Sequence, residues 1–224
     1  GVDVFINDDL PWLKQQNTRV IANIAGNTPE EYCEMAEKLS STDVDMIEMN
    51  ISCPNVKSGG VQFGTSCESV GSITSAVRKH CTKPLIVKLS PNVTDIAEIA
   101  KSAEANGADA ISMINTLTGM RIDINTKRPI IRNNTGGMSG PAVFPVAVRM
   151  VWQVSNAVKI PIIGMGGIST WQDAVEMMIA GASALQIGTV FFSDPYAPIK
   201  IAEGINEYLD KNGMKSVTEL TGTI

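Results

Sequence analysis

The feature that most constrains the fold is a repeat of strand-like and helix-like segments. Six short apolar runs each precede a stretch with helical periodicity: RVIANIAG (19–26), DMIEMNIS (45–52), PLIVKLS (84–90), DAISMIN (109–115), IPIIGMGG (160–167) and SALQIGT (183–189). The runs are apolar on both faces, as parallel strands are when helices cover them. The repeat therefore predicts an α/β protein, either a barrel or a doubly wound sheet.

Helix start signals support this interpretation. Thr28, Pro29 and Glu31 form a capping-box pattern with proline in the first turn, which predicts a helix start. A second helix is expected to begin at Ser169 or Thr170 and to end near Gly181.

One connection is longer than an ordinary strand-to-helix loop. It runs from Thr116 to Pro145, and within it RIDINTKRPIIR (121–132) has the pattern of a small hairpin. We expect this segment to fold over a site.

The number of strands limits how complete a barrel could be. A closed barrel has eight βα units and usually roughly 250 residues. This sequence has 224 residues and only six predicted strands. We therefore expect residues 1–224 to form a single domain, a (β/α)8 TIM barrel that lacks its first two strands and is incomplete at the N-terminus.

Composition excludes several classes of function. The formal net charge is −5, with 18 Lys and Arg against 23 Asp and Glu and no basic block, so a nucleic-acid or anionic-membrane surface is not indicated. No apolar run approaches the ~20 residues of a membrane span, and the start lacks a signal-peptide pattern. We expect a cytoplasmic protein that acts on small molecules or other proteins.

The cysteines and the histidine have no metal-binding spacing. Cys33, Cys53, Cys67 and Cys81 form no CxxC pair and no His-Cys group, so they predict neither a zinc nor an iron–sulfur site. His80 is the only histidine, and it follows a predicted helix end, where a cation complements the dipole. Catalysis is therefore expected to proceed without histidine.

Polar residues gather where the predicted strands end. In a βα barrel the carboxyl ends of the strands form the ligand site. The residues at these ends are Asn50, Cys53, Asn55, Lys88, Asn115 and Thr116.

The last two predicted strands end in glycine turns, GMGGI and QIGT. Glycines let backbone N–H groups approach an anion, and the helix that follows GMGGI adds positive potential, so the pair of turns suits a phosphate. The alternative is that these glycines only permit tight turns.

Lys88 is expected to point to the inner face, because strand alternation places it opposite Val87 and Leu89. An inward lysine is costly unless it is paired. Glu48, on the same face one layer deeper, is the candidate partner. The pair is either functional or a structural ion pair.

Cys53 differs from the other cysteines. An unpaired cysteine is usually a small buried hydrophobe, which suits Cys33, Cys67 and Cys81. Cys53 follows a strand end and precedes a proline, which places it in a loop that faces the site. Asn50 and Asn55 beside it offer neutral donors and acceptors for a carbonyl-rich substrate.

Together the motifs resemble a known family. NISCPNVKSGGVQFG, VKLSPNVTDI, MINTLTG, GGMSGPAVFPVAVRMV, GMGGI and LQIGT are similar, in this order, to the catalytic subunit of class 1B, NAD-linked dihydroorotate dehydrogenases. Class 2 members have serine in place of Cys53, and class 1A members differ in the loop after SCPNV. The resemblance covers the whole chain and implies an FMN-binding eight-stranded barrel, a flavoprotein oxidoreductase that oxidises dihydroorotate to orotate in pyrimidine (UMP) biosynthesis.

The resemblance also implies roles for individual residues. Cys53 matches the general base, which takes a proton from substrate C5 while hydride passes from C6 to FMN. The substrate contacts would be Asn50, Asn115 and Thr116, with Asn55 beside them. The residues that match FMN contacts are Asn23, Asn50, Lys88, Ile114, Gly140, Gly166, Gly167, Gly188 and Thr189.

The family's first two strands carry a flavin-binding serine and lysine and a substrate loop, which this sequence lacks. The resemblance further implies a partner subunit that carries FAD and a 2Fe–2S cluster and passes electrons to NAD. Two catalytic and two electron-transfer subunits would form a heterotetramer.

Two alternatives remain open from the residues. A barrel enzyme could use Cys53 as a covalent nucleophile on a nucleotide, as inosine monophosphate dehydrogenase does, with the glycine turns binding the substrate phosphate. The chain could also be a catalytically dead assembly partner. A bound flavin would separate the first alternative from the family function.

Overall fold

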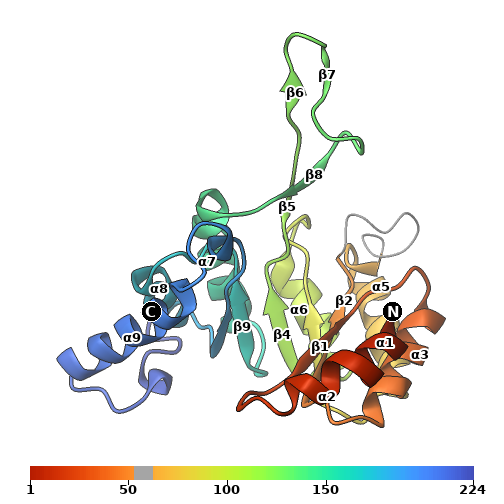
Figure 1. Cartoon of the computed structure of the whole chain (residues 1–224), viewed down its shortest axis with the longest axis horizontal. Coiled ribbons are helices and arrows are strands. Elements are labelled where there is room, and N and C mark those ends of the chain that lie inside the picture. The colour runs from red at the N-terminus through yellow and green to blue at the C-terminus, as the bar shows by residue number, and fades with distance from the viewer. Residues whose placement is uncertain (53–62) are drawn as a thin grey trace. The chain divides into compact units, whose positions relative to one another are not determined.

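A computed structural model describes residues 1–52 and 63–224 of the chain (Figure 1). The chain forms two compact units. Unit 1 comprises Gly1–Leu89 and Glu98–Ser112, and unit 2 comprises Ser90–Ala97 and Met113–Ile224.

Unit 1 is built on parallel strands. They are β1 (Ile21–Ile24), β2 (Met46–Asn50), β3 (Leu85–Lys88) and β4 (Ala110–Met113), and they pair in this order. The helices between them are α3 (Pro29–Ser40), α5 (Cys67–Arg78) and α6 (Ile96–Ala105). Short helical turns precede β1: α1 (Val2–Val4), η1 (Phe5–Asp9) and α2 (Leu10–Leu13).

The core of unit 1 lies on both faces of this sheet. Leu85, Ile86 and Val87 follow one another on β3 and are all completely buried, although their side chains alternate between the two faces. Burial on both faces is what the continuous apolar runs of the sequence predict for parallel strands.

The start of α3 follows the predicted pattern only in part. The Thr28 hydroxyl accepts a hydrogen bond from the Glu31 N–H, and Pro29 is the first helical residue. The Glu31 carboxylate, however, accepts from the N–H of Asn27, one residue before the cap.

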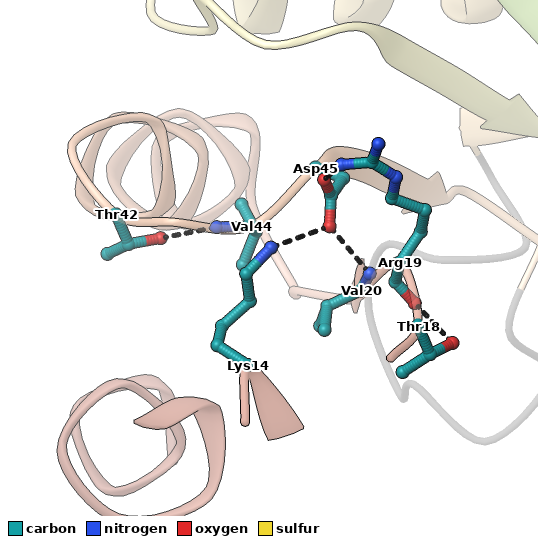
Figure 2. Close-up of polar contacts among 7 residues, drawn as sticks. All are labelled: Lys14, Thr18, Arg19, Val20, Thr42, Val44 and Asp45. Carbon is teal, nitrogen blue, oxygen red and sulfur yellow. Dashed lines mark hydrogen bonds and ion pairs between the residues drawn. The ribbon is translucent and has the colours of Figure 1, made fainter. Parts of the chain in front are cut away.

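A charged cluster joins the segment before β1 to the start of β2 (Figure 2). The Asp45 carboxylate accepts a hydrogen bond from the Val20 N–H at 2.8 Å and lies 3.0 Å from both the Lys14 ammonium and the Arg19 guanidinium. The Val20 carbonyl in turn accepts from the Asp45 N–H at 2.9 Å. Asp45 therefore links the end of α2 to the first strand pair.

Unit 2 contains two more parallel strands, β9 (Ile162–Met165) and β10 (Ala184–Gln186). Its helices are α7 (Phe144–Ser155), α8 (Trp171–Ile179) and α9 (Ala197–Lys211), with shorter turns η2 (Pro141–Val143), η3 (Thr189–Phe192) and η4 (Val217–Glu219). The helices α8 and α9 pack closely, because Gly204 leaves no room for a Cβ beside the Trp171 ring.

The long connection in unit 2 forms a two-part antiparallel hairpin (Figure 1). Strand β5 (Leu117–Gly119) pairs with β8 (Gly136–Met138), and β6 (Ile122–Asp123) pairs with β7 (Arg128–Pro129). The hairpin predicted over residues 121–132 is confirmed, and it is longer than expected because β5 and β8 extend it at the base.

The α/β class expected from the sequence is confirmed. Each of the six predicted runs contains one parallel strand, so the described residues hold six strands of an incomplete (β/α)8 set. No helix in the described ranges is long and apolar enough to cross a membrane. A single domain over residues 1–224 stays a prediction.

Candidate active site

Asn50 ends β2, and its main chain and side chain are both held. Its carbonyl accepts a hydrogen bond of 2.8 Å from the hydroxyl of Tyr32, a completely buried residue of α3. Its side-chain oxygen accepts from the N–H and the hydroxyl of Ser52 at 3.4 and 3.2 Å. These hydrogen bonds fix the position of the end of β2, including the Asn50 side chain. Cys53 and Asn55 follow in the sequence and lie outside the described residues.

Strand register brings three polar side chains into one row across unit 1. Asn50 pairs with Lys88, and Lys88 pairs with Ser112. Residues at paired positions of parallel strands point to the same face, so the three side chains are neighbours. The prediction that Lys88 faces opposite to Val87 and Leu89 agrees with its partly exposed side chain, since both neighbours are fully buried.

Glu48 lies one layer below this row. It forms an ion pair with Lys88, as hypothesised from the sequence. Its carboxylate is 3.7 Å from the Lys88 ammonium, and it also accepts a hydrogen bond from the Asn23 side chain. Glu48 is 3% exposed, so its charge has little access to water. The 3.7 Å separation is beyond hydrogen-bond length. Glu48 therefore offsets the lysine charge without taking a short hydrogen bond from it.

Ser112 was not singled out from the sequence. Its hydroxyl is completely buried and has no hydrogen-bond partner among the described residues. Buried hydroxyl groups nearly always have a partner. An unpartnered hydroxyl next to Lys88 is therefore a feature that a bound polar group could satisfy.

In unit 2 the residues from Ile114 to Thr116 follow β4. The Ile114 N–H donates to the carbonyl of Met165, the last residue of β9, at 2.9 Å. The Asn115 side-chain oxygen accepts from the Thr116 N–H at 2.7 Å. These contacts bring Ile114 beside the first glycine turn.

Three of the four glycines of unit 2 that were predicted to bind FMN lie close together. Gly140, Gly166 and Gly167 all have positive φ, the region that favours glycine. A Cβ on Gly167 would lie 2.7 Å from the Gly140 carbonyl oxygen, and one on Gly166 would lie 3.2 Å from Ile114 Cγ1. Tight chain packing is thus a sufficient reason for Gly166 and Gly167.

The second glycine turn has a different environment. Gln186 pairs with Met165, so Gly188 and Thr189 follow β10 beside the turn that follows β9. A Cβ on Gly188 would meet nothing within 4 Å, and its φ of −128° lies outside the left-handed region. Packing therefore does not explain glycine at position 188.

The start of α8 is already capped by its own side chains. The Asp173 carboxylate accepts from the N–H groups of Ser169 and Thr170, both at 2.9 Å, and Thr170 is the N-cap. The positive end of this helix therefore faces a carboxylate, and a phosphate at this edge would depend more on the glycine turns.

The other cysteines differ from one another. Cys81 is buried, as expected. Cys33 is partly buried, and burial together with Glu30 and Glu37 raises the pKa of its thiol. The expectation of burial is wrong for Cys67, because it is the first residue of α5 and its side chain is exposed.

The amino-acid sequence is similar to that of one known protein family over most of its length. The family model described as dihydroorotate dehydrogenase matches residues 1–209. Over 224 residues the chain is 55% identical to the dihydroorotate dehydrogenase B (NAD(+)) catalytic subunit of Alkaliphilus oremlandii and 57% identical to that of Alkaliphilus metalliredigens. It is 56% identical over 225 residues to the protein of the same name from Bacteroides fragilis. Each match covers 100% of this chain and 74% of the relative.

Proposed function

The chain belongs to the dihydroorotate dehydrogenase family, and from this premise we propose that it is an NAD-linked class 1B catalytic subunit. It oxidises dihydroorotate to orotate in cytoplasmic pyrimidine biosynthesis. The observation that carries the proposal is the row of Asn50, Lys88 and Ser112, with Glu48 below it. A cation and neutral polar groups side by side suit a ring with carbonyl and N–H edges.

The residues present fit FMN. In unit 1 the buried, unpartnered Ser112 hydroxyl stands beside Lys88 and supports a polar ligand there. In unit 2 the open position at Gly188 supports a ligand close to the backbone. The proposed FMN-binding set is Asn23, Asn50, Lys88, Ile114, Gly140, Gly166, Gly167, Gly188 and Thr189.

Each protein group has a separate task in this proposal. Bound FMN supplies the acceptor for the hydride that leaves C6 of the substrate. Cys53, as its thiolate, takes the proton from C5. Asn50, Asn55, Asn115 and Thr116 bind the polar edges of the substrate and fix its orientation. Lys88 is held in place by Glu48 and provides a fixed positive charge beside the flavin.

The proposed partner is an electron-transfer subunit. The relatives are named as catalytic subunits, which supports a second subunit in the complex. We propose that this subunit carries FAD and a 2Fe–2S cluster and passes electrons to NAD, in a heterotetramer of two catalytic and two electron-transfer subunits.

The proposal is tested by anaerobic addition of dihydroorotate to the FMN-loaded protein. A thiol has a pKa of about 8.5, and serine is a far weaker acid. We therefore expect the rate of flavin reduction to rise from mildly acidic to alkaline pH, and Cys53→Ser to be slow at neutral pH while it still binds orotate and FMN. Stopped-flow absorbance measures the rate. Failure of the wild type to reduce its flavin would reject the function, whereas equal rates in Cys53→Ser would reject only the base.

A further inference from the structure

Asn92, which is not part of the proposed site, forms hydrogen bonds with the segment that contains two of the proposed substrate contacts, Asn115 and Thr116. Asn92 follows β3 after a short turn and is exposed. Its side-chain NH₂ donates to the Thr116 carbonyl, and its side-chain oxygen accepts from the Thr118 N–H, both at 3.0 Å. We call these two bonds the amide clamp. All of these residues belong to unit 2.

The clamp has the form of strand pairing. In an extended chain the C=O of one residue and the N–H of the residue two positions later point to the same side. The Asn92 amide offers one donor and one acceptor to that side and replaces the neighbouring strand that would otherwise make these bonds. The Thr116 to Thr118 backbone is therefore fixed in direction.

Asn92 is itself held by Ser90, which is 5% exposed. The Ser90 hydroxyl accepts from the Asn92 N–H at 3.1 Å and from its side-chain NH₂ at 3.3 Å. These bonds fix the orientation of the amide before it meets Thr116 and Thr118. The clamp thus connects the turn after β3 to the segment after β4.

Strand β8 limits the same segment through a separate set of contacts. Thr118 pairs with Gly137, and a Cβ on Gly137 would lie 2.2 Å from Thr116 Oγ1. The Thr116 side chain therefore has little freedom on the Gly137 side, while the Asn92 amide fixes its carbonyl.

We propose that Asn92 is a positioning residue that preorganises Asn115 and Thr116 for substrate through the amide clamp. This rests on the proposed function, in which those two residues contact dihydroorotate and orotate. Loss of the clamp would leave their backbone to be ordered at the moment of binding, which weakens affinity without removing a direct contact.

The test compares Asn92→Ala and Asn92→Ser with Asn133→Ala in the FMN-loaded protein. Asn133 is an exposed asparagine between β7 and β8, outside the clamp, so its variant controls for loss of an amide in unit 2. Two lost hydrogen bonds should raise the orotate Kd by on the order of 10-fold in both Asn92 variants. The KM for dihydroorotate should rise by a similar factor, with a smaller change in kcat and unchanged FMN content.

Amide hydrogen exchange at Thr118 provides a readout independent of activity. It should be faster in both Asn92 variants than in wild type and Asn133→Ala. Wild-type orotate affinity in Asn92→Ala and Asn92→Ser would overturn the positioning role. If wild type bound no orotate, the proposed function itself would fail.

Discussion

At the scale of single residues, the pair of Glu48 and Lys88 sets a nearly buried charge against a partly buried one. A nearly buried carboxylate balances a lysine that we propose as an FMN contact. Removing one member of such a pair leaves the other charge without compensation. The structural and the functional interpretations of Lys88 are therefore compatible, because the ion pair keeps a costly cation in place.

Glu48→Gln tests this coupling. Glutamine keeps the shape and can still accept from Asn23, but it removes the charge. The free energy of unfolding should therefore fall, by less than the ~3–5 kcal/mol typical of a fully buried pair, because the Lys88 side chain is partly exposed. Adding Lys88→Met to Glu48→Gln should restore part of this loss, because no unpaired charge remains. Urea unfolding of the two single variants and the double variant measures the effect. Strictly additive losses would show that the two charges do not interact.

Some contacts of single residues could be predicted from the sequence, and others could not. The inward direction of Lys88 follows from strand alternation, which is a local property. The row with Ser112 and the bond between Asn23 and Glu48 depend on register between strands, which no single segment determines. Asn92 has only turn-like neighbours in the sequence, and its bonds to Thr116 and Thr118 require the fold.

At the scale of elements, the six strands and the hairpin were predictable because apolar runs and turn residues act over a few positions. The hydrogen bonds at the helix N-termini were less predictable from the sequence. Both Thr28 and Thr170 are caps, as the pattern indicated, but Glu31 bonds to Asn27 and Asp173 occupies the start of α8. Which N–H group the acidic side chain of the first turn accepts from depends on the path of the preceding loop. The sequence pattern does not specify that path.

The Asp45 cluster joins elements and predicts a pH dependence (Figure 2). The Val20 N–H, the Lys14 ammonium and the Arg19 guanidinium hold the pKa of Asp45 well below its usual value. A depressed pKa in the folded state stabilises the protein above the unfolded pKa of about 3.9. This contribution is lost as the pH falls through the lower folded pKa.

Asp45→Asn should therefore be less stable than wild type at neutral pH, and the difference should shrink once the pH falls below about 4. Asp43→Asn is the matched control, because it removes an exposed carboxylate from the same loop outside the cluster. Urea unfolding across this pH range gives the comparison. A difference that stays constant down to low pH would show that the Asp45 charge contributes nothing.

At the scale of the whole molecule, the proposed FMN ligands are divided between the two units. Asn23, Asn50 and Lys88 belong to unit 1, whereas the glycine turns and Thr189 belong to unit 2. A ligand that binds only the folded state stabilises every part that it contacts. FMN should therefore stabilise each unit whose residues bind it, and each unit can be tested by itself.

FMN should accordingly slow amide hydrogen exchange after β10 in unit 2. Gly188→Asp places a negative charge where the phosphate is proposed, in a position with room for a side chain, so the fold should persist while FMN affinity falls. Protection by FMN after β10 should then disappear. Gly188→Ala adds a Cβ without charge and should keep most of the protection. Hydrogen exchange followed by mass spectrometry, with and without FMN, measures each unit separately. Equal protection in Gly188→Asp and Gly188→Ala would contradict a phosphate site at Gly188.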